Sequence, residues 1–408
     1  MKTAEFPLKG ITVVELGTHI AIPSAARVMA DMGANVIKVE GRFGDGWRYV
    51  GREFDVPFGD EENPYFVMQN TNKRFISINI KEPDGVAVLK KLLATADVFM
   101  TSVRSAALAR QGLDYETLTE EFPRLIYCQN TGYGMLGAES KRPGFDQATF
   151  WSRTGGTVDW GVKDVPPVRP SLGFGDTATG AQLLIGVLSA LLGREHSGHG
   201  TFVTTSLLGS GVWYNGGGIV SAQKGYEHTY PEDREHPMNP FTSYYRAKDG
   251  EWFTMVVLED ASGWDGMWTK MCNVLGMEDW LSDIEKGIRR PSNEIIHRVN
   301  EEIAKKTRDE WFEIFAQHNV VAEKCAHLRD VSEDPQVLEN GYLVPVTYRS
   351  GNTSLVPCAP ISFSDYEMLK PDVVGTVGAD TADILREYGY SDEEIAALVE
   401  KKAVKVAK

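Results

Sequence analysis

Short apolar runs alternate with helical patterns through the first third of the chain, and this alternation restricts the fold more than any other feature. The apolar runs are ITVVEL (11–16), NVIKVE (35–40), FISINI (75–80), DVFMTS (97–102) and RLIYCQNTGYG (124–134). The stretches between them have the apolar spacing of amphipathic helices. Strands that alternate with helices predict a parallel, doubly wound α/β sheet whose strands are buried on both faces.

The chain is too long for one ordinary core, so a second domain is expected. Its 408 residues exceed the length at which single cores stop growing. A loop-like composition near 225–245 precedes the strand pattern EWFTMVVL (251–258) and two helical patterns. We therefore predict a large domain of residues 1–225, completed by 331–408, and a smaller α/β domain of residues 226–330.

Charge and cysteine content restrict the partners and the location. The net charge of −15 argues against a general nucleic-acid binder, because such affinity needs clustered lysine and arginine. The four cysteines form no CxxC pair, so reduced thiols are expected rather than disulfides or a zinc site. No signal peptide is visible, and no uninterrupted apolar run approaches the roughly 18 residues of a membrane span. We expect a cytoplasmic protein without a membrane partner.

The first strand–helix–strand unit is a candidate site for a dinucleotide. Glu40 ends its second strand, where an acid that binds ribose stands in NAD(P)-dependent oxidoreductases. The turn between strand and helix, Gly17–Pro23, holds one glycine, whereas the dinucleotide fingerprint needs three. An oxidoreductase is therefore a weak alternative, and Glu40 is expected to be a surface acid. His19 in this turn is either a structural histidine or a ligand contact.

Several cations follow the predicted strands and are candidates for binding phosphate groups. In an acidic chain they form a suggestive set, although each alone is more typical of a solvated surface charge. These residues are Lys73, Arg74, Lys81, Arg104 and Arg110.

Asp176 is the carboxylate that raises the question of catalysis. It stands in GFGDTATG (173–180), where a long apolar helical pattern begins. Aspartate is a favoured residue at helix N-caps, which gives one interpretation. The other is a covalent nucleophile toward an activated acyl group, with the flanking glycines leaving space for a substrate. The residues alone leave both interpretations open.

The motifs along nearly the whole chain, taken together, resemble the class III coenzyme A transferases. The resemblance is carried by LKGITVVELGTHIAIPSAARVMADMGANVIKVE (8–40), NKRFISINIK (72–81), PGFDQATF (143–150), GFGDTATG (173–180) and ILREYGYSDEEI (384–395). It implies a large Rossmann-like domain, an interlocked homodimer, and a CoA thioester as substrate without a permanently bound cofactor or metal. Acyl-CoA and a free carboxylic acid are then the small-molecule partners.

The resemblance also implies roles for individual residues. Asp176 matches the family's catalytic nucleophile, which passes through an aspartyl anhydride and an aspartyl-CoA thioester. Phe145 and Asp146 are expected beside the reacting thioester. The CoA-binding positions carried over from the family's motifs are His19, Ile20, Arg42, Ile78, Lys81, Ser102, Val103, Arg110, Phe145 and Asp146.

Two alternatives stay open within this resemblance. The related α-methylacyl-CoA racemases have a histidine where this chain has Phe145, so a racemase would lack its second base. A non-catalytic CoA-binding protein would keep the pocket and tolerate the loss of Asp176.

The stretches DEENPYFVMQNTNKR (60–74), PGFDQATFWSRTGG (143–156) and NPFTSYYRAKDG (239–250) look most like the branch that handles 2-hydroxyisocaproate and aryl-lactates in amino-acid fermentation. A pocket for such apolar acyl groups, or else plain core packing, is expected for four aromatic residues. These are Phe150, Trp151, Phe174 and Trp213.

Overall fold

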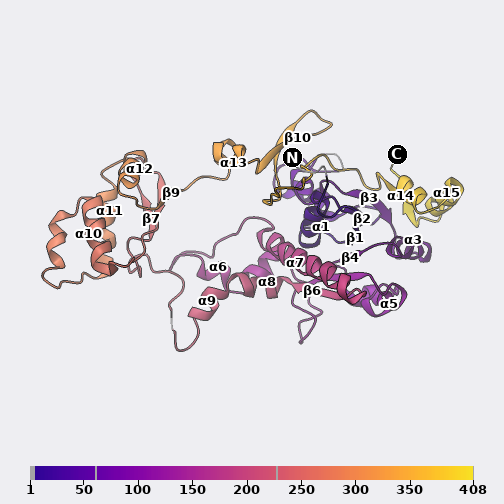
Figure 1. The fold of residues 1–408 in the computed structure, drawn as a ribbon, viewed down its shortest axis with the longest axis horizontal. Helices are drawn as coiled ribbons and strands as arrows, with labels where there is room; N and C mark the ends of the chain where they lie inside the picture. The colour runs from indigo at the N-terminus through magenta and orange to yellow at the C-terminus, as the bar shows by residue number, and fades with distance from the viewer. Residues whose placement is uncertain (1–4, 60–61, 227, 408) are drawn as a thin grey trace. The chain divides into compact units, whose positions relative to one another are not determined.

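The structure is a computed structural model that describes residues 5–59, 62–226 and 228–407 (Figure 1). The chain divides into two compact units: a large unit of residues 1–157, 169–221 and 334–408, and a small unit of residues 158–168 and 222–333. Residues 158–168, which the predicted bounds placed in the large domain, therefore belong to the small unit. The Lys163 amide donates to the Glu232 carbonyl at 3.0 Å, and the Lys163 side chain pairs with Asp233.

The large unit is built on a seven-stranded sheet of the order β12-β3-β2-β1-β4-β5-β6. Every neighbouring pair is parallel except β12 with β3. The strands are β1 (Thr12–Leu16), β2 (Asn35–Glu40), β3 (Arg74–Ile78), β4 (Val98–Thr101), β5 (Ile126–Thr131), β6 (Phe202–Ser206) and β12 (Val404–Lys405). The doubly wound parallel sheet predicted from the alternating pattern is confirmed.

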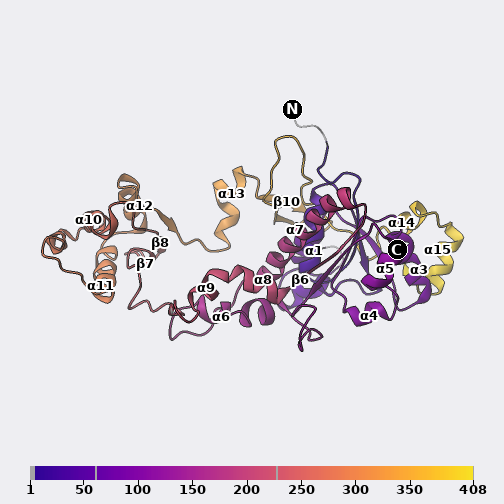
Figure 2. The same cartoon turned by 60° about the horizontal axis from the view of Figure 1, so that its bottom comes forward.

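Helices cover both faces of this sheet because alternate strand residues point to opposite sides. Val13 belongs to the core shared with α1 and α7, whereas the next residue, Val14, belongs to the core under α3, α5, α14 and α15. Figure 2 shows the two groups of helices on opposite sides of the strands. Their bounds are α1 (Ala21–Asp31), α7 (Phe174–Ser197), α3 (Pro83–Leu93), α5 (Tyr115–Glu121), α14 (Thr381–Glu387) and α15 (Asp392–Glu400).

The remaining elements of the large unit are short, and several of them border the carboxyl ends of the strands. A β-hairpin packs through Val346 and Val356 against Phe66 and Val67 of α2. The bounds are η1 (Gly46–Glu53), α2 (Pro64–Asn70), α4 (Ser105–Ala109), η2 (Gln147–Ser152), α6 (Gly156–Asp159, at the unit boundary), α8 (Leu207–Tyr214), α9 (Gly216–Ser221), α13 (Pro335–Glu339), β10 (Leu343–Thr347) and β11 (Thr353–Pro357).

The small unit has an antiparallel sheet of the order β7-β8-β9 and its own aromatic core. Trp268, Trp311 and Phe253 lie in this core and are buried, so the unit has the means to hold together independently of the parallel sheet. Its elements are β7 (Ser243–Arg246), β8 (Trp252–Met255), α10 (Gly263–Leu275), η3 (Glu278–Asp283), α11 (Ser292–Ile303), α12 (Arg308–Gln317), β9 (Ala322–Lys324) and η4 (Asp330–Glu333).

Helix α7 is the long apolar helix that follows the candidate nucleophile. By length and composition alone it is apolar enough to cross a membrane, although the sequence showed no uninterrupted run of that length. Its buried side chains, including Leu183 and Val187, pack in the core with α1 and the sheet. Gly180 permits this approach, because a Cβ there would lie 2.0 Å from the Ser24 hydroxyl and 2.9 Å from the Ala21 carbonyl.

We expect Gly180→Ala to lower the free energy of unfolding by about 1–3 kcal/mol, since overpacking forces the backbones of α1 and α7 apart. Gly193→Ala is the matched control on the same helix, because a Cβ there meets nothing within 4 Å. It should raise stability by up to about 1 kcal/mol through helix propensity. Urea denaturation of both variants measures the difference, and equal effects would contradict the close-packing explanation.

Candidate active site

The strand order reverses between β1 and β4: β2 and β3 lie beyond β1 on one side, whereas β5 and β6 lie beyond β4 on the other. The loops after β1 and β4 therefore leave the sheet side by side. In doubly wound sheets, ligands bind at the carboxyl ends of the strands at such a reversal. The two loops are in contact, since the Thr18 amide donates to the Ser102 hydroxyl at 3.3 Å. His19, Ile20, Ser102 and Val103, four of the predicted CoA-binding residues, therefore lie at this edge of the sheet.

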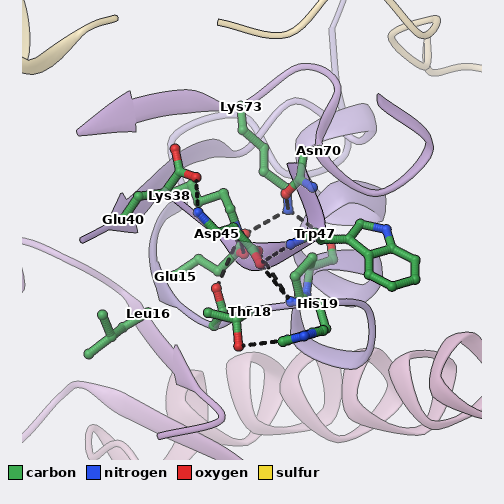
Figure 3. A network of polar contacts seen from close by, with 12 residues as sticks. Glu15, Leu16, Thr18, His19, Lys38, Glu40, Asp45, Trp47, Asn70 and Lys73 are labelled. Atoms are coloured by element: carbon green, nitrogen blue, oxygen red, sulfur yellow. Dashed lines mark hydrogen bonds and ion pairs between the residues drawn. The ribbon is translucent and has the colours of Figure 1, made fainter. Parts of the chain in front are cut away.

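A buried ionic network lies directly beneath the β1 loop (Figure 3). The Lys38 ammonium is within 2.7 Å of Glu15 and 3.1 Å of Asp45, and all three side chains are almost completely buried. Lys73 donates to the other oxygen of Glu15 at 2.6 Å and to Asn70 at 3.0 Å. Two carboxylates thus face two ammonium groups away from solvent, which is the arrangement that buried charges require.

Burial and the shared carboxylates act differently on the two lysines. Burial lowers the pKa of Lys38, but Glu15 and Asp45 more than offset this and hold it above its ordinary value. Burial also lowers the pKa of Lys73, to about 8, and the positive charge of the nearby Lys38 lowers it further. The negative charge of Glu15 acts in the opposite direction but does not offset these two effects. Lys73 therefore serves this network, and the prediction that it helps to clamp a phosphate is wrong.

Glu40 was expected to be a surface acid, and this expectation is wrong because the residue is buried. Its two oxygens accept hydrogen bonds from the Arg48 guanidinium at 2.8 and 2.9 Å, and one of them also accepts from the Asp45 amide. The guanidinium in turn lies over the Phe66 ring. Glu40 thus anchors the segment after β2.

Asp45 connects this segment to the β1 loop. Its carboxylate accepts the His19 amide at 3.1 and 3.2 Å and the Trp47 amide at 3.0 Å, in addition to the Lys38 ammonium. His19 has a φ of 65°, in the left-handed region that non-glycine residues seldom occupy. The exposed His19 ring lies 6.0 Å from the Trp47 ring and 6.2 Å from the Phe145 ring.

The N-terminus of α7 is held by a carboxylate from a different element. Helix α7 begins at Phe174, so Asp176 is its third residue, and Gly173 occupies the cap position with a φ of 73°. The Asp146 carboxylate accepts the amides of Gly175 at 3.1 Å and Asp176 at 3.3 Å. Asp146 thus performs the capping that the sequence offered as one role for Asp176, so the cap interpretation of Asp176 is wrong.

The flanking glycines allow close packing and do not leave open space. A Cβ on Gly173 would lie 2.3 Å from Ile20 Cδ1. A Cβ on Gly175 would lie 2.4 Å from the Phe150 ring and 2.6 Å from Asp146 Oδ1. The expectation that these two glycines leave space for a substrate is therefore wrong, because they bring the β1 loop and Asp146 close to the start of α7.

Asp176 is poorly solvated and has a carboxylate as its neighbour. Burial, with a further contribution from the charge of Asp146, raises the pKa of Asp176 to about 7. Burial also raises the pKa of Asp146, against the lowering effect of its two backbone hydrogen bonds. Asp146 Oδ1 is buried without a hydrogen-bond partner in the described part of the chain. Two adjacent carboxyls with raised pKa values are typical of catalytic sites.

The remaining CoA-binding residues that the sequence predicted lie around the same edge, with different exposure. Arg42 follows β2, Lys81 follows β3 and Arg110 directly follows α4, and all three are exposed. Ile78 is buried in the core of the sheet. Arg74 pairs with Glu387 at 2.7 Å, which gives this cation a structural partner.

The four aromatic residues divide into two pairs. Phe150 and Trp151 are buried together with Leu207, as core packing predicts. Phe174 is 50 % exposed and Trp213 is 72 % exposed, so these two are available to a ligand. Phe145, beside Asp146, is also exposed at 66 %. Apolar surface therefore lies next to both carboxylates.

Sequence reasoning missed the residues that hold the site from below. Glu15, Lys38 and Asp45 were not among the predicted site residues. A signal was present in Glu15 and Lys38, since each interrupts an otherwise apolar strand that is buried on both faces. Within the described ranges, no group of three or more His, Cys, Asp or Glu side chains is placed to hold a metal ion.

The model of CoA-transferase family III matches residues 8–381. The chain belongs to CoA-transferase family III. It is therefore a CoA-transferase, and enzymes of this class use CoA thioesters as substrates.

Two curated relatives and one solved structure illustrate the similarity. The (R)-2-hydroxy-4-methylpentanoate CoA-transferase of Clostridioides difficile is 35 % identical over 98 % of this chain and 99 % of that protein. The cinnamoyl-CoA:phenyllactate CoA-transferase of Clostridium sporogenes is 34 % identical over 98 % of this chain and 97 % of that protein. The crystal structure of a CAIB/BAIF family protein from Brucella suis has a TM-score of 0.77 at 27 % identity, covering 94 % of this chain and all of that one.

The raised pKa of Asp176 predicts a gain in stability when its charge is removed. Between the ordinary value of 3.8 and about 7, the folded enzyme holds a proton that the unfolded chain releases. The free energy of unfolding therefore falls as the pH rises through this window. We expect Asp176→Asn to raise the Tm by roughly a few degrees at pH 8 and to change it little at pH 4.

Thermal unfolding at both pH values checks this expectation. Asp84→Asn is the matched control, because Asp84 also lies in the first turn of a helix but pairs with Lys401 at 2.9 Å. It should give no gain at pH 8. The same pH dependence in both variants would show that poor solvation of Asp176 is not the cause.

Proposed function

We propose that this enzyme transfers CoA from an acyl-CoA to a free carboxylic acid, with Asp176 as the covalent nucleophile. The observation that carries the proposal is the carboxyl of Asp176, poorly solvated beside Asp146 and exposed aromatic rings at the start of α7. A carboxylate with a raised pKa is a stronger nucleophile toward a thioester carbonyl than a solvated one. The ionised form of Asp176 is the reactive one.

The proposed reaction exchanges activated carboxyl groups in four balanced steps. The Asp176 carboxylate attacks the acyl-CoA carbonyl, which forms a mixed anhydride and expels the CoA thiolate. The thiolate attacks the aspartyl carbonyl, which forms an aspartyl-CoA thioester and releases the donor acid. The acceptor carboxylate then attacks this thioester, giving a second anhydride and the thiolate again. The thiolate finally attacks the acceptor's carbonyl in this anhydride, which forms the new acyl-CoA and releases the Asp176 carboxylate.

For the acids, we propose 2-hydroxy acids with a branched or aryl side chain. The two curated relatives carry such acids in their names, 2-hydroxy-4-methylpentanoate and phenyllactate. The exposed rings of Phe145 and Phe174 flank the two carboxylates and offer apolar contact to such side chains. A racemase needs a second base to move the α-proton, and Phe145 has no titratable group.

The CoA moiety is proposed to bind along the carboxyl edge of the sheet. His19, Ile20, Ser102 and Val103 line the reversal point, and Arg42, Lys81 and Arg110 supply exposed positive charge after neighbouring elements. Phosphate groups are bound well by such cations. Ile78, inside the sheet, would act on the pocket by packing.

A homodimer and a cytoplasmic location remain part of the proposal. The dimer is supported by exposed apolar side chains on α7 and α8 of the large unit, of the kind that interfaces bury. These are Ile185, Leu192 and Val212.

We expect new acyl-CoAs to form when the enzyme is mixed with acyl-CoA donors and a panel of short fatty, 2-hydroxy and aryl acids. Asp176→Asn should abolish transfer, because the amide is a poor nucleophile, whereas Asp84→Asn should retain it. For the unmodified enzyme, kcat/KM should rise about tenfold per pH unit below pH 7 and level off above it. Mass spectrometry identifies the products. Transfer that survives in Asp176→Asn would refute the nucleophile assignment.

We expect Arg110→Ala to weaken CoA binding roughly tenfold or more through the loss of a charge-assisted hydrogen bond to phosphate. Isothermal titration with CoA measures the affinity. Arg329→Ala, an exposed arginine of the small unit, is the control and should bind CoA as the unmodified enzyme does. Unchanged affinity in Arg110→Ala would place the phosphates elsewhere.

A further inference from the structure

The buried ionic network beneath the β1 loop is a costly arrangement that the proposed chemistry does not use directly. Replacing buried ion pairs by packed apolar residues is often neutral or stabilising, so such pairs are weak evidence for a purely stabilising role. Here the network is also placed specifically. Glu15 and Lys38 lie near the carboxyl ends of β1 and β2, and Asp45 lies in the segment after β2, under the loop at the reversal point.

Asp45 is the member of this network that contacts the loop. One carboxylate serves three backbone or side-chain donors: the His19 amide, the Trp47 amide and the Lys38 ammonium. The His19 amide is shared between both oxygens of Asp45. A left-handed conformation at a non-glycine residue persists when its surroundings impose it, and this hydrogen bond is a restraint of that kind.

The conformation of His19 determines where the next residue goes. Ile20 is buried, and its Cδ1 atom would lie 2.3 Å from a Cβ on Gly173, so Ile20 packs directly against the Gly173 backbone. Gly173 precedes α7, whose third residue is Asp176. A continuous path of contacts therefore runs from Lys38 through Asp45, His19 and Ile20 to the backbone that carries the nucleophile.

We propose that Asp45 is a positioning residue for CoA transfer, which acts by fixing the left-handed backbone of His19 and, through Ile20, the start of the nucleophile's helix. The proposal rests on the function proposed above. Asp45 itself stays beneath the loop, buried and paired with Lys38, and takes no part in bond making.

The charge of Asp45 matters as well as its shape. Three donors converge on its two oxygens, and a carboxylate has acceptor sites for all of them without a donor of its own. An amide would turn an NH2 group toward one of the three donors, and the buried Lys38 would lose one of its two carboxylate partners. Asp45→Asn therefore disturbs the restraint on His19 with almost no change of volume.

The test compares Asp45→Asn with Asp31→Asn in the full-length enzyme. Asp31 is an equally buried aspartate that pairs with Arg27 at 2.8 Å at the end of α1, so the substitution and its burial are matched. We expect Asp45→Asn to lower kcat/KM for acyl-CoA about 100-fold, the scale on which misplacement of reacting groups acts. Asp31→Asn should stay within twofold per folded molecule.

Separate readouts distinguish positioning from general destabilisation. Circular dichroism and thermal unfolding give the folded fraction, initial rates give kcat and KM, and titration with CoA in an Asp176→Asn background gives binding without catalysis. Kinetics of Asp45→Asn within twofold of the unmodified enzyme would overturn the proposal. Equal losses in Asp45→Asn and Asp31→Asn would overturn it too, since they would show a purely structural effect.

A second variant decides the matter if Asp45→Asn does not fold. Ile20→Val removes only Cδ1, the atom that lies against Gly173, at a cost of about 0.5–1.5 kcal/mol of stability. It should lower kcat at least threefold, whereas an unchanged kcat would overturn the proposed path. Failure of the transfer function itself is visible separately, because the unmodified enzyme would then form no new acyl-CoA with any acid of the panel.

Discussion

The contact between the Lys38 ammonium and the carboxylates of Glu15 and Asp45 is the interaction on which the site depends. It joins β1, β2 and the segment after β2 where water has no access, so none of the three can move without leaving a charge unpaired. Leaving a buried charge without its partner costs several kcal/mol. The parallel sheet holds the strands at a fixed spacing. The ion pairs hold Asp45 in place, and Asp45 in turn fixes the conformation of the loop after β1.

The start of α7 presents the opposite electrostatic situation. A helix N-terminus ordinarily favours a carboxylate, through its free amides and the helix dipole. Here Asp146 takes the amides of Gly175 and Asp176, so Asp176 receives its neighbour's negative charge without those hydrogen bonds. Burial and this charge make ionised Asp176 less stable and more basic, with its pKa raised to about 7. The raised pKa lowers the stability of the fold at neutral pH, and it would make the carboxylate more reactive in the nucleophile role proposed for Asp176.

The alternating pattern was enough to predict the parallel sheet and the loops at the carboxyl ends of its strands, because strand and helix periods depend on near neighbours in sequence. The errors have a common physical origin in partners that are remote in sequence. The sequence around Glu40 predicts a surface acid, but in the structure Glu40 is paired with Arg48. The sequence around Lys73 predicts a surface cation, but in the structure Lys73 is paired with Glu15. Gly175, next to Asp176, was expected to leave open space, but Asp146, 29 residues away in sequence, packs on it.

The two parts of the site meet where Ile20 lies against Gly173. The proposed reaction needs the thiolate of CoA to return to the same carbonyl region twice, so the CoA-binding loop and the nucleophile must keep their separation through every step. A contact between a buried β-branched side chain and a glycine backbone suits this need, since branching restricts χ1 of Ile20 and the glycine has no side chain to rotate. The ionic network fixes one end of that contact and Asp146 fixes the other. In the proposed reaction, the chemistry takes place between two backbone segments, each held by a carboxylate that does not itself react: the buried Asp45 and the partly buried Asp146.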